Sequence, residues 1–318
     1  MPPSIHLSVS LPETMSGYRL DQALAELIPE YSRSRLQQWI RDGQVTMDDR
    51  IPRVRERVHG GEAVEIRAEI TAASTCLPEA IPLDVVYEDA DLLVINKPPG
   101  LVVHPAVGNR DGTLQNALLY FDPELASLPR AGIVHRLDKD TSGLMVVARN
   151  LTAHKRLVEA LQARTVRREY LTVVNTVLTA GGRVDAPIGR HPVDRKRMAV
   201  VTGGKQAITH YRVVERYRAH TLVRVRLETG RTHQIRVHMS YLHCPVVGDP
   251  VYGGRLRLPR GATGQLKEVL RQFKRQALHA ERLALSHPRD GRPMVWEAAL
   301  PEDMQGLVEV LRDDLKDE

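Results

Sequence analysis

Residues 132–149 read GIVHRLDKDTSGLMVVAR, a short polar turn between two apolar stretches. The flanks 132–138 and 143–149 are rich in aliphatic side chains, so we expect both to be strands. Asp138 and Asp140 lie in the turn, with Arg136 and Lys139 beside them. A carboxylate that nearby cations hold at the end of a strand can act as a nucleophile or a base. By itself, the stretch is equally compatible with an ordinary Asp/Thr/Ser turn.

Further strands and helices are expected on both sides of this turn. Apolar runs predict strands, and apolar residues at helical spacing predict helices. The expected strands are 83–89, 91–100, 166–174, 208–218 and 220–230, and the expected helices are 112–120 and 152–164. A succession of strands of this kind predicts an α+β domain with a mixed, mainly antiparallel sheet.

The first 70 residues predict a smaller α/β domain. Two short helices precede strands at 44–49 and 62–69, with Gly60 and Gly61 in the turn between them. Residues 71–82, TAASTCLPEAIP, are small, polar and proline-bearing, which is typical of a linker. We therefore expect domains at 1–70 and 83–318. A cluster of arginines lies in the second helix and the following loop: Arg33, Arg35, Arg41, Arg50, Arg53, Arg55 and Arg57.

The charge of the 318-residue chain favours a polyanionic partner. The formal net charge is +6, and only eight of the 45 basic residues are lysine. Residues 149–237 hold 19 basic and 6 acidic residues, whereas residues 1–70 hold 9 and 11. Forked arginine contacts suit phosphate groups, although an arginine-rich composition can also reflect the genome.

Several other classes of site lack their local requirements. The sequence has no phosphate-binding GxxxxGK[ST], no strand-linked GxGxxG and no HExxH motif. Cys76 and Cys244 belong to no CxxC pair, and there is no signal peptide or apolar run long enough to span a membrane. We expect a cytoplasmic protein without a disulfide framework. The spacing of His233, His238 and His243 fits neither face of a helix nor one side of a strand, so a metal site is not predicted.

Two segments supply candidate partners for Asp138. In 166–174, VRREYLTVV, Tyr170 can stack on a base and exchange a proton, or it can be an ordinary core tyrosine. In 227–238, LETGRTHQIRVH, we expect a strand whose alternate polar side chains converge after the Gly230 turn. Arg231 beside a buried aspartate can form a bidentate pair, or it can bind phosphate on a surface strand.

Five segments in this order resemble the RluA-type family of RNA pseudouridine synthases: HRLDKDTSG, RREY, GRTHQIRVH, HCPVVGDPVYGG and RQALHAERL. The resemblance extends from about residue 80 to the C-terminus. The preceding RLDQAL, SRSRLQQWIRDGQVTMDD and GGEAVEI are similar to the S4 domain, a small RNA-binding module. The resemblance implies a pseudouridine synthase catalytic domain with an S4-like domain before it.

The resemblance also implies roles for individual residues. Asp138 is the expected catalytic aspartate, Arg136 fills the space left by the flipped nucleotide, Tyr170 stacks on the base, and Arg231 pairs with the aspartate. No metal and no cofactor are implied. The implied substrate is uridine in 23S ribosomal RNA or the assembling large subunit, in the helix 69 stem-loop. The RNA-binding residues expected in the first domain are Arg33, Arg35, Arg41, Arg53 and Arg55.

Two alternatives stay open on the sequence. One is a non-catalytic RNA-binding protein of ribosome assembly, in which Asp138 is a turn residue. The other takes DKDTSG as the DxDx[TV] signature of magnesium-dependent aspartate phosphotransferases. The second alternative is weaker, because His135 and Arg136 stand where a dry apolar strand is expected.

Overall fold

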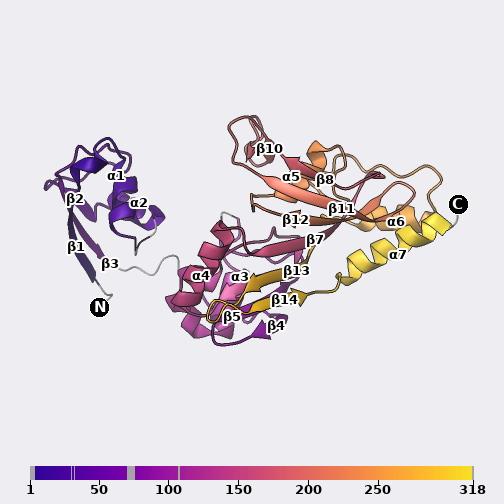
Figure 1. Cartoon of the computed structure of the whole chain (residues 1–318), viewed down its shortest axis with the longest axis horizontal. Coiled ribbons are helices and arrows are strands. Elements are labelled where there is room, and N and C mark those ends of the chain that lie inside the picture. The colour runs from indigo at the N-terminus through magenta and orange to yellow at the C-terminus, as the bar shows by residue number, and fades with distance from the viewer. Residues whose placement is uncertain (1–3, 30, 32, 70–75, 107, 317–318) are drawn as a thin grey trace. The chain divides into compact units, whose positions relative to one another are not determined.

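The computed structural model describes residues 4–29, 31, 33–69, 76–106 and 108–316. The chain forms two compact units, residues 1–75 and 76–318, each with its own hydrophobic core (Figure 1). Of the linker expected at 71–82, residues 71–75 lie outside the described residues. Residues 76–82 belong to the second unit, where Asn116 Nδ2 donates to the Leu77 carbonyl at 2.8 Å.

The first unit packs two helices against a small antiparallel sheet. Its sheet has the order β1-β3-β2, and the expected pairing of the strands around 44–49 and 62–69 is confirmed as β2 with β3. The first strand, β1, was not predicted from the sequence. The core joins Leu24, Leu36, Trp39 and Ile66, all at most 2% exposed. The elements are β1 Ser4–Ser10, η1 Glu13–Met15, α1 Leu20–Leu27, α2 Arg33–Arg41, β2 Val45–Met47 and β3 Ala63–Glu69.

The second unit is built on a nine-stranded sheet with the order β4-β5-β6-β13-β7-β12-β11-β8, and β14 pairs with β13. Every pairing in it is antiparallel except β6 with β13, so the expected mixed, mainly antiparallel sheet is confirmed. Its strands are β4 Val85–Glu88, β5 Leu92–Lys97, β6 Ser142–Ala148, β7 Arg167–Val174, β8 Gly182–Asp185, β11 Ile208–Arg216, β12 Thr221–Leu227, β13 Leu278–Ser286 and β14 Pro293–Glu297.

Helices and a separate hairpin complete the second unit. Helices are expected at 112–120 and 152–164 and are present as α3 and α4. Figure 1 shows the long C-terminal helix α7 reaching away from β13 and β14 beside α6. The elements are α3 Leu114–Phe121, η2 Pro123–Ser127, η3 Pro129–Gly132, α4 Leu151–Gln162, α5 Gln234–Tyr241, α6 Gly264–Gln272 and α7 Glu302–Lys316, with the hairpin β9 Ile188–Arg190 and β10 Met198–Val200.

The parallel contact between β6 and β13 lies in the middle of the sheet. Gly143 pairs with Ala280 there and has a φ of +114°. A Cβ at residue 143 would lie 2.3 Å from the Ala280 carbonyl oxygen, so only glycine fits without moving the strand. The chain therefore passes from the Asp138 turn into β6 through residue 143, where a side chain larger than that of glycine does not fit.

Two sequence expectations about local structure were wrong. Residues 132–138 form no strand, because η3 ends at Gly132 and only Ile133 makes an isolated bridge, to Val147. Residues 234–241 form helix α5 and not a strand. The Gln234 side chain explains the helix start, since its Oε1 accepts from the Arg231 amide at 3.0 Å and the Thr229 hydroxyl at 2.7 Å.

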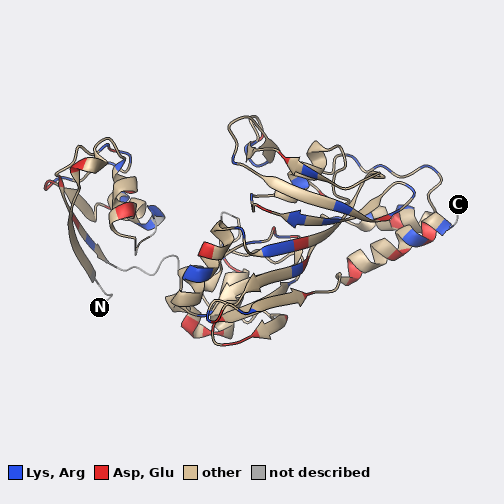
Figure 2. Cartoon of the chain, in the orientation of Figure 1, with Lys and Arg blue, Asp and Glu red and all other residues tan. Residues whose placement is uncertain are grey.

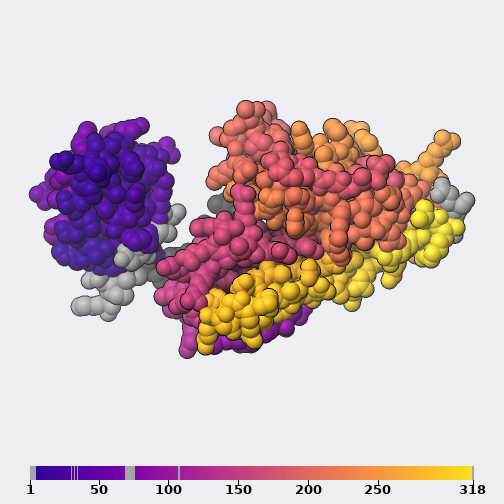
Figure 3. Space-filling view, in the orientation of Figure 1, coloured from indigo at the N-terminus to yellow at the C-terminus, as the bar shows by residue number. Residues whose placement is uncertain are grey.

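Basic residues of the second unit follow its central strands. Figure 2 shows Lys and Arg on β7 and β12 and in the loop beside β10. In the space-filling view, the magenta segment around α4 abuts the orange segment that contains β11 and β12 (Figure 3). No helix within the described ranges has both the length and the apolar character needed to cross a membrane.

Candidate active site

The turn that carries Asp138 is held from below by a buried lysine. Lys97, at the end of β5, is 1% exposed, and its Nζ donates to three main-chain carbonyls. One of them is the Lys139 carbonyl, at 2.9 Å, directly after Asp138. Burial lowers the pKa of Lys97 to about 7, although the three carbonyls favour its ammonium form. The buried Lys97 side chain thus fixes the main chain beside the carboxylate.

The start of β13 holds the same turn from the other side. Arg275 Nη1 donates to the Asp140 carbonyl at 3.1 Å, and Gln276 Nε2 donates to the Thr141 hydroxyl at 3.1 Å. His279 Nδ1 lies 2.9 Å from the Ser142 hydroxyl, and both residues are buried. The turn is consequently rigid although it is a connection and not a regular element.

A cleft of about 620 Å³ opens above this turn. Its lining includes Asp138, Tyr170, Arg136, Arg168 and His233, which come from the turn, from β7 and from the start of α5. Tyr170 is 5% exposed, and burial raises the pKa of its hydroxyl, so the ring keeps its proton. The cleft combines the aromatic ring of Tyr170 with several cations and two carboxylates, Asp138 and Glu228, and this mixture suits an anionic ligand with an aromatic base.

Arg236, on α5, is the cation that pairs with Asp138. Its Nη1 donates to Asp138 Oδ2 at 3.0 Å, while Nε and Nη2 donate to the two carboxylate oxygens of Asp249 at 2.7 and 2.9 Å. Burial opposes the charge of Asp249, but the hydrogen bonds from Arg236 lower the pKa of that carboxyl below its usual value. Asp249 thus aims the guanidinium, and the guanidinium aims Asp138.

The expectation that Arg231 pairs with Asp138 is corrected by this geometry. Arg231 lines the cleft, but its Nε donates to the Gln206 carbonyl at 3.0 Å. The expected strand would have brought Arg231 to the aspartate, whereas the helix from Gln234 onward presents Arg236 instead. Arg231 therefore lies at the edge of the site.

Arg136 and Arg168 are cations of the cleft that no described group neutralises. Arg136 is exposed, and the structure gives it no hydrogen bond or ion pair within the described residues. Arg168 is half-buried, and its Nε is buried without a hydrogen-bond partner among them. His135, beside Arg136, accepts from the Val146 amide at 3.1 Å, and burial lowers its pKa to about 3. The free positive charge of the cleft therefore comes from arginine.

The arginines expected to bind RNA in the first unit differ in their surroundings. Arg33 is committed to the buried Asp21, with Nη2 2.7 Å from Oδ2. Arg35 lies over the Trp39 ring at 6.0 Å, and Arg41 Nη1 donates to Gln38 at 2.8 Å. Arg53 and Arg55 are exposed and line a shallow depression with Arg50 and Glu56. Arg53 and Arg55 are thus the most available of the five.

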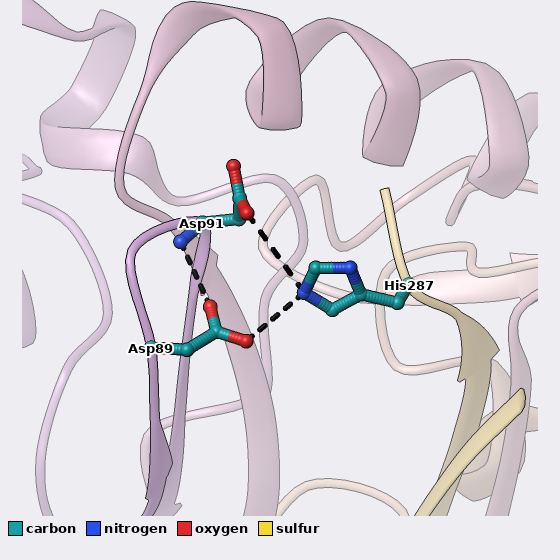
Figure 4. Close-up of side chains that lie close together, drawn as sticks. All are labelled: Asp89, Asp91 and His287. Atoms are coloured by element: carbon teal, nitrogen blue, oxygen red, sulfur yellow. Dashed lines mark hydrogen bonds and ion pairs between the residues drawn. The ribbon is translucent and has the colours of Figure 1, made fainter. Parts of the chain in front are cut away.

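A second cluster of titratable groups lies away from the cleft. Figure 4 shows Asp89, Asp91 and His287, with His287 Nε2 2.9 Å from Asp89 Oδ2 and 4.0 Å from Asp91 Oδ2. The carboxylate oxygens are already engaged: Tyr87 donates to Asp89 at 2.6 Å, and Arg289 pairs with Asp91 at 2.7 Å. The cluster joins the β4–β5 turn to the β13–β14 turn, which is a structural role.

Sequence reasoning missed three residues that build the site, namely Lys97, Arg236 and Asp249. Lys97 stands in the NKPPG turn, and Asp249 stands in HCPVVGDPVYGG. A helix assignment for 234–241 would have placed His233 and Arg236 three residues apart on one face. The sequence signal for Arg236 was therefore present but was assigned to the wrong kind of element.

Comparison with known proteins gives concordant matches. Residues 91–241 match the family described as RNA pseudouridylate synthase. The chain is 57% identical over 310 residues to a ribosomal large subunit pseudouridine synthase D of Pseudomonas aeruginosa, which covers 98% of this chain and 97% of the relative. It is 55% identical over 314 residues to the protein of that name in Escherichia coli K12, covering 98% and 96%.

Solved structures also resemble the second unit's fold. Human RNA pseudouridylate synthase domain containing 4 is 27% identical and has a TM-score of 0.56, covering 72% of this chain and 93% of that one. Human RNA pseudouridylate synthase domain containing 1 is 25% identical with a TM-score of 0.54, covering 74% and 96%. The chain therefore resembles pseudouridine synthases both in sequence and in the fold of its second unit.

Proposed function

The chain belongs to the RNA pseudouridine synthase family, and from this premise we propose that it isomerises uridine to pseudouridine in 23S RNA of the large ribosomal subunit, with Asp138 as the nucleophile. The names of the relatives support a ribosomal substrate. We further propose the helix 69 stem-loop as the target and the assembling large subunit as the partner. The reaction is an intramolecular isomerisation, so it transfers nothing to a second substrate.

The observation that carries the role of Asp138 is its pairing with Arg236. One carboxylate oxygen accepts from Arg236 at 3.0 Å, while the other, Oδ1, lies 3.9 Å from His233 Nε2, beyond hydrogen-bonding distance, in a residue that lines the cleft. An oxygen held on one side and open on the other is suited to attack a bound nucleotide. In the isomerisation the bond between N1 and C1′ breaks, C5 bonds to C1′ and loses its proton, and N1 gains one.

Tyr170 and Arg136 have supporting roles in this proposal. Flipping a base out of a stem costs a few kcal/mol of stacking, which the buried Tyr170 ring can offset by stacking on the uracil. Arg136 is exposed at the edge of the cleft and enters the stem in place of the nucleotide. We also propose the first unit as an S4-like RNA-binding domain, because its arginines Arg53 and Arg55 are free for phosphate groups.

The test of this proposal is Asp138→Asn in the full-length protein. Asparagine keeps the size of the side chain but removes the nucleophilic charge, so we expect pseudouridine formation to fall at least about a thousandfold. Release of tritium from [5-³H]uridine in 23S RNA from a deletion strain measures the reaction, and filter binding measures RNA affinity. Lost modification with retained binding supports the proposal. Undiminished modification would refute it and would favour a non-catalytic RNA-binding protein.

A further inference from the structure

His233 is a titratable group of the cleft to which the proposed chemistry assigns no task. It precedes α5 with a φ of 56°, a left-handed conformation that turns its ring into the cleft. Its Nδ1 lies 2.8 Å from the Tyr252 hydroxyl, and its Nε2 lies 3.9 Å from Asp138 Oδ1. The distance to Asp138 is too long for a hydrogen bond, so Nε2 has no hydrogen-bond partner among the described residues, in a side chain that lines the cleft.

The hydrogen bonds of Tyr252 determine which nitrogen of His233 carries the proton. The Met198 amide, on β10, donates to the Tyr252 hydroxyl at 2.9 Å. Burial raises the pKa of Tyr252, so the phenol keeps its single proton, and His233 Nδ1 is its only acceptor among the described residues. Nδ1 is consequently an acceptor, and the proton of the neutral imidazole lies on Nε2.

Tyr252 is itself held firmly. Its amide donates to Asp249 Oδ1 at 3.0 Å, and the Arg197 and Arg236 guanidinium groups lie 5.2 and 5.1 Å from its ring centroid. Asp249 therefore orients both Arg236, which pairs with one oxygen of Asp138, and Tyr252, which fixes the ring beside the other. The N–H group at His233 Nε2 is therefore oriented beside Asp138 before any ligand binds.

We propose that His233 is a catalytic residue that donates a hydrogen bond from Nε2 to an oxygen of the flipped uridine, and that Tyr252 is the positioning residue that fixes its tautomer. This inference rests on the proposed function. A ligand oxygen that accepts from His233 Nε2 at about 3 Å lies beside the nucleophile, because Asp138 Oδ1 is 3.9 Å from Nε2. The acceptor is a uracil carbonyl or a ribose hydroxyl, which share this chemistry.

Two substitutions of His233 separate its donor from its structural role. Asparagine tolerates the left-handed backbone and reaches only the Nδ1 position, whereas glutamine places an amide N–H near the Nε2 position. We expect His233→Asn to lower the single-turnover rate about a hundredfold and His233→Gln to recover at least a tenth of the wild-type rate. RNA affinity should stay within about twofold in both. Equal rates for wild type and His233→Asn would overturn the proposal, and so would equal losses in the two variants.

Tyr252→Phe tests the tautomer through its pH profile. Without the hydroxyl, the proton of neutral His233 can move to Nδ1, and the donor at Nε2 is lost. The imidazolium donates from Nε2 regardless, so lowering the pH through the pKa of His233 should restore the variant towards the wild-type rate. The charged groups facing His233 are Asp138, Arg236, Asp249 and Arg136. A loss of the same size at every pH would contradict the assignment.

A target 2′-deoxyuridine in a synthetic stem-loop distinguishes the two acceptors. If the ribose hydroxyl is the acceptor, His233→Asn should not lower the single-turnover rate on the deoxyuridine substrate any further. If a uracil carbonyl is the acceptor, His233→Asn should lower that rate by the same factor as on the ribose substrate. Asp138→Asn in the same assay separates this inference from the proposed function. An active Asp138→Asn enzyme refutes the nucleophile, whereas an inactive one together with a fully active His233→Asn enzyme refutes the inference about His233 alone.

Discussion

Arg53 and Arg55 of the first unit differ from Arg236 of the second unit in how their charge is used. Arg53 and Arg55 in the first unit are exposed, and their guanidinium groups make no hydrogen bond to any described residue. Arg236 in the second unit is 4% exposed and makes three hydrogen bonds to two carboxylates. The guanidinium groups of Arg53 and Arg55 are not held in a fixed orientation by hydrogen bonds. The guanidinium group of Arg236 is held in one orientation, and its charge is largely balanced by the two carboxylates. A count of basic residues therefore says little about which arginine performs chemistry.

The sharpest test of this contrast compares Arg236 with Arg231. Arg236→Ala leaves Asp249 buried without its partner and Asp138 without its guide, so we expect the single-turnover rate to fall at least about a hundredfold and stability by roughly 3 kcal/mol. Arg231→Ala should cost less than about tenfold, because the one hydrogen bond of the Arg231 side chain to a described residue goes to the Gln206 carbonyl. Arg236→Lys, which keeps the charge but not the fork, should fold and stay impaired. A larger loss in Arg231→Ala would reverse the assignment.

Lys97, like Arg236, is a buried basic residue, but its partners are main-chain carbonyls and not carboxylates. Its pKa in the folded protein is lowered to about 7 by burial, so between pH 7 and 10.5 the unfolded chain binds more protons than the folded one. The free energy of unfolding should therefore rise with pH in this window, relative to Lys97→Met, by about 4 kcal/mol. Denaturant titrations of both proteins at pH 7, 8.5 and 10 measure the difference. A difference that is flat or falls with pH would show that Lys97 stays an ammonium ion throughout.

The smallest effects are expected in the first unit, where Arg33 provides a matched control for Arg53 and Arg55. Hydrogen bonds from Gln37 and Arg33 lower the pKa of Asp21 despite its burial, so Arg33→Ala should destabilise the unit by about 1–2 kcal/mol. The double variant Arg53→Ala/Arg55→Ala should keep its stability and reduce the slope of log affinity against log salt by roughly 1 to 2. An unchanged salt slope would remove both arginines from the RNA-binding surface.

The parts of the fold that depend on local pattern could be predicted from the sequence. The polar turn at Asp138, the helices α3 and α4 and the strands β11 and β12 follow from apolar spacing and turn residues. The choice of Arg236 over Arg231 was missed, because it depends on a helix where a strand was expected, and the start of that helix is fixed by the side chain of Gln234. The role of Lys97 could not be predicted either, since its three carbonyl partners come together only in the folded chain.

The parallel pairing of β6 with β13 has a consequence for synthesis of the chain. Ser142 and His279, which are hydrogen-bonded there, are 137 residues apart. At ordinary rates of translation, His279 emerges on the order of ten seconds after the turn that carries Asp138. The first unit has all of its own partners long before then. A nascent chain therefore acquires a folded first unit well before its catalytic aspartate is held in place, and the cleft is completed only near the end of synthesis.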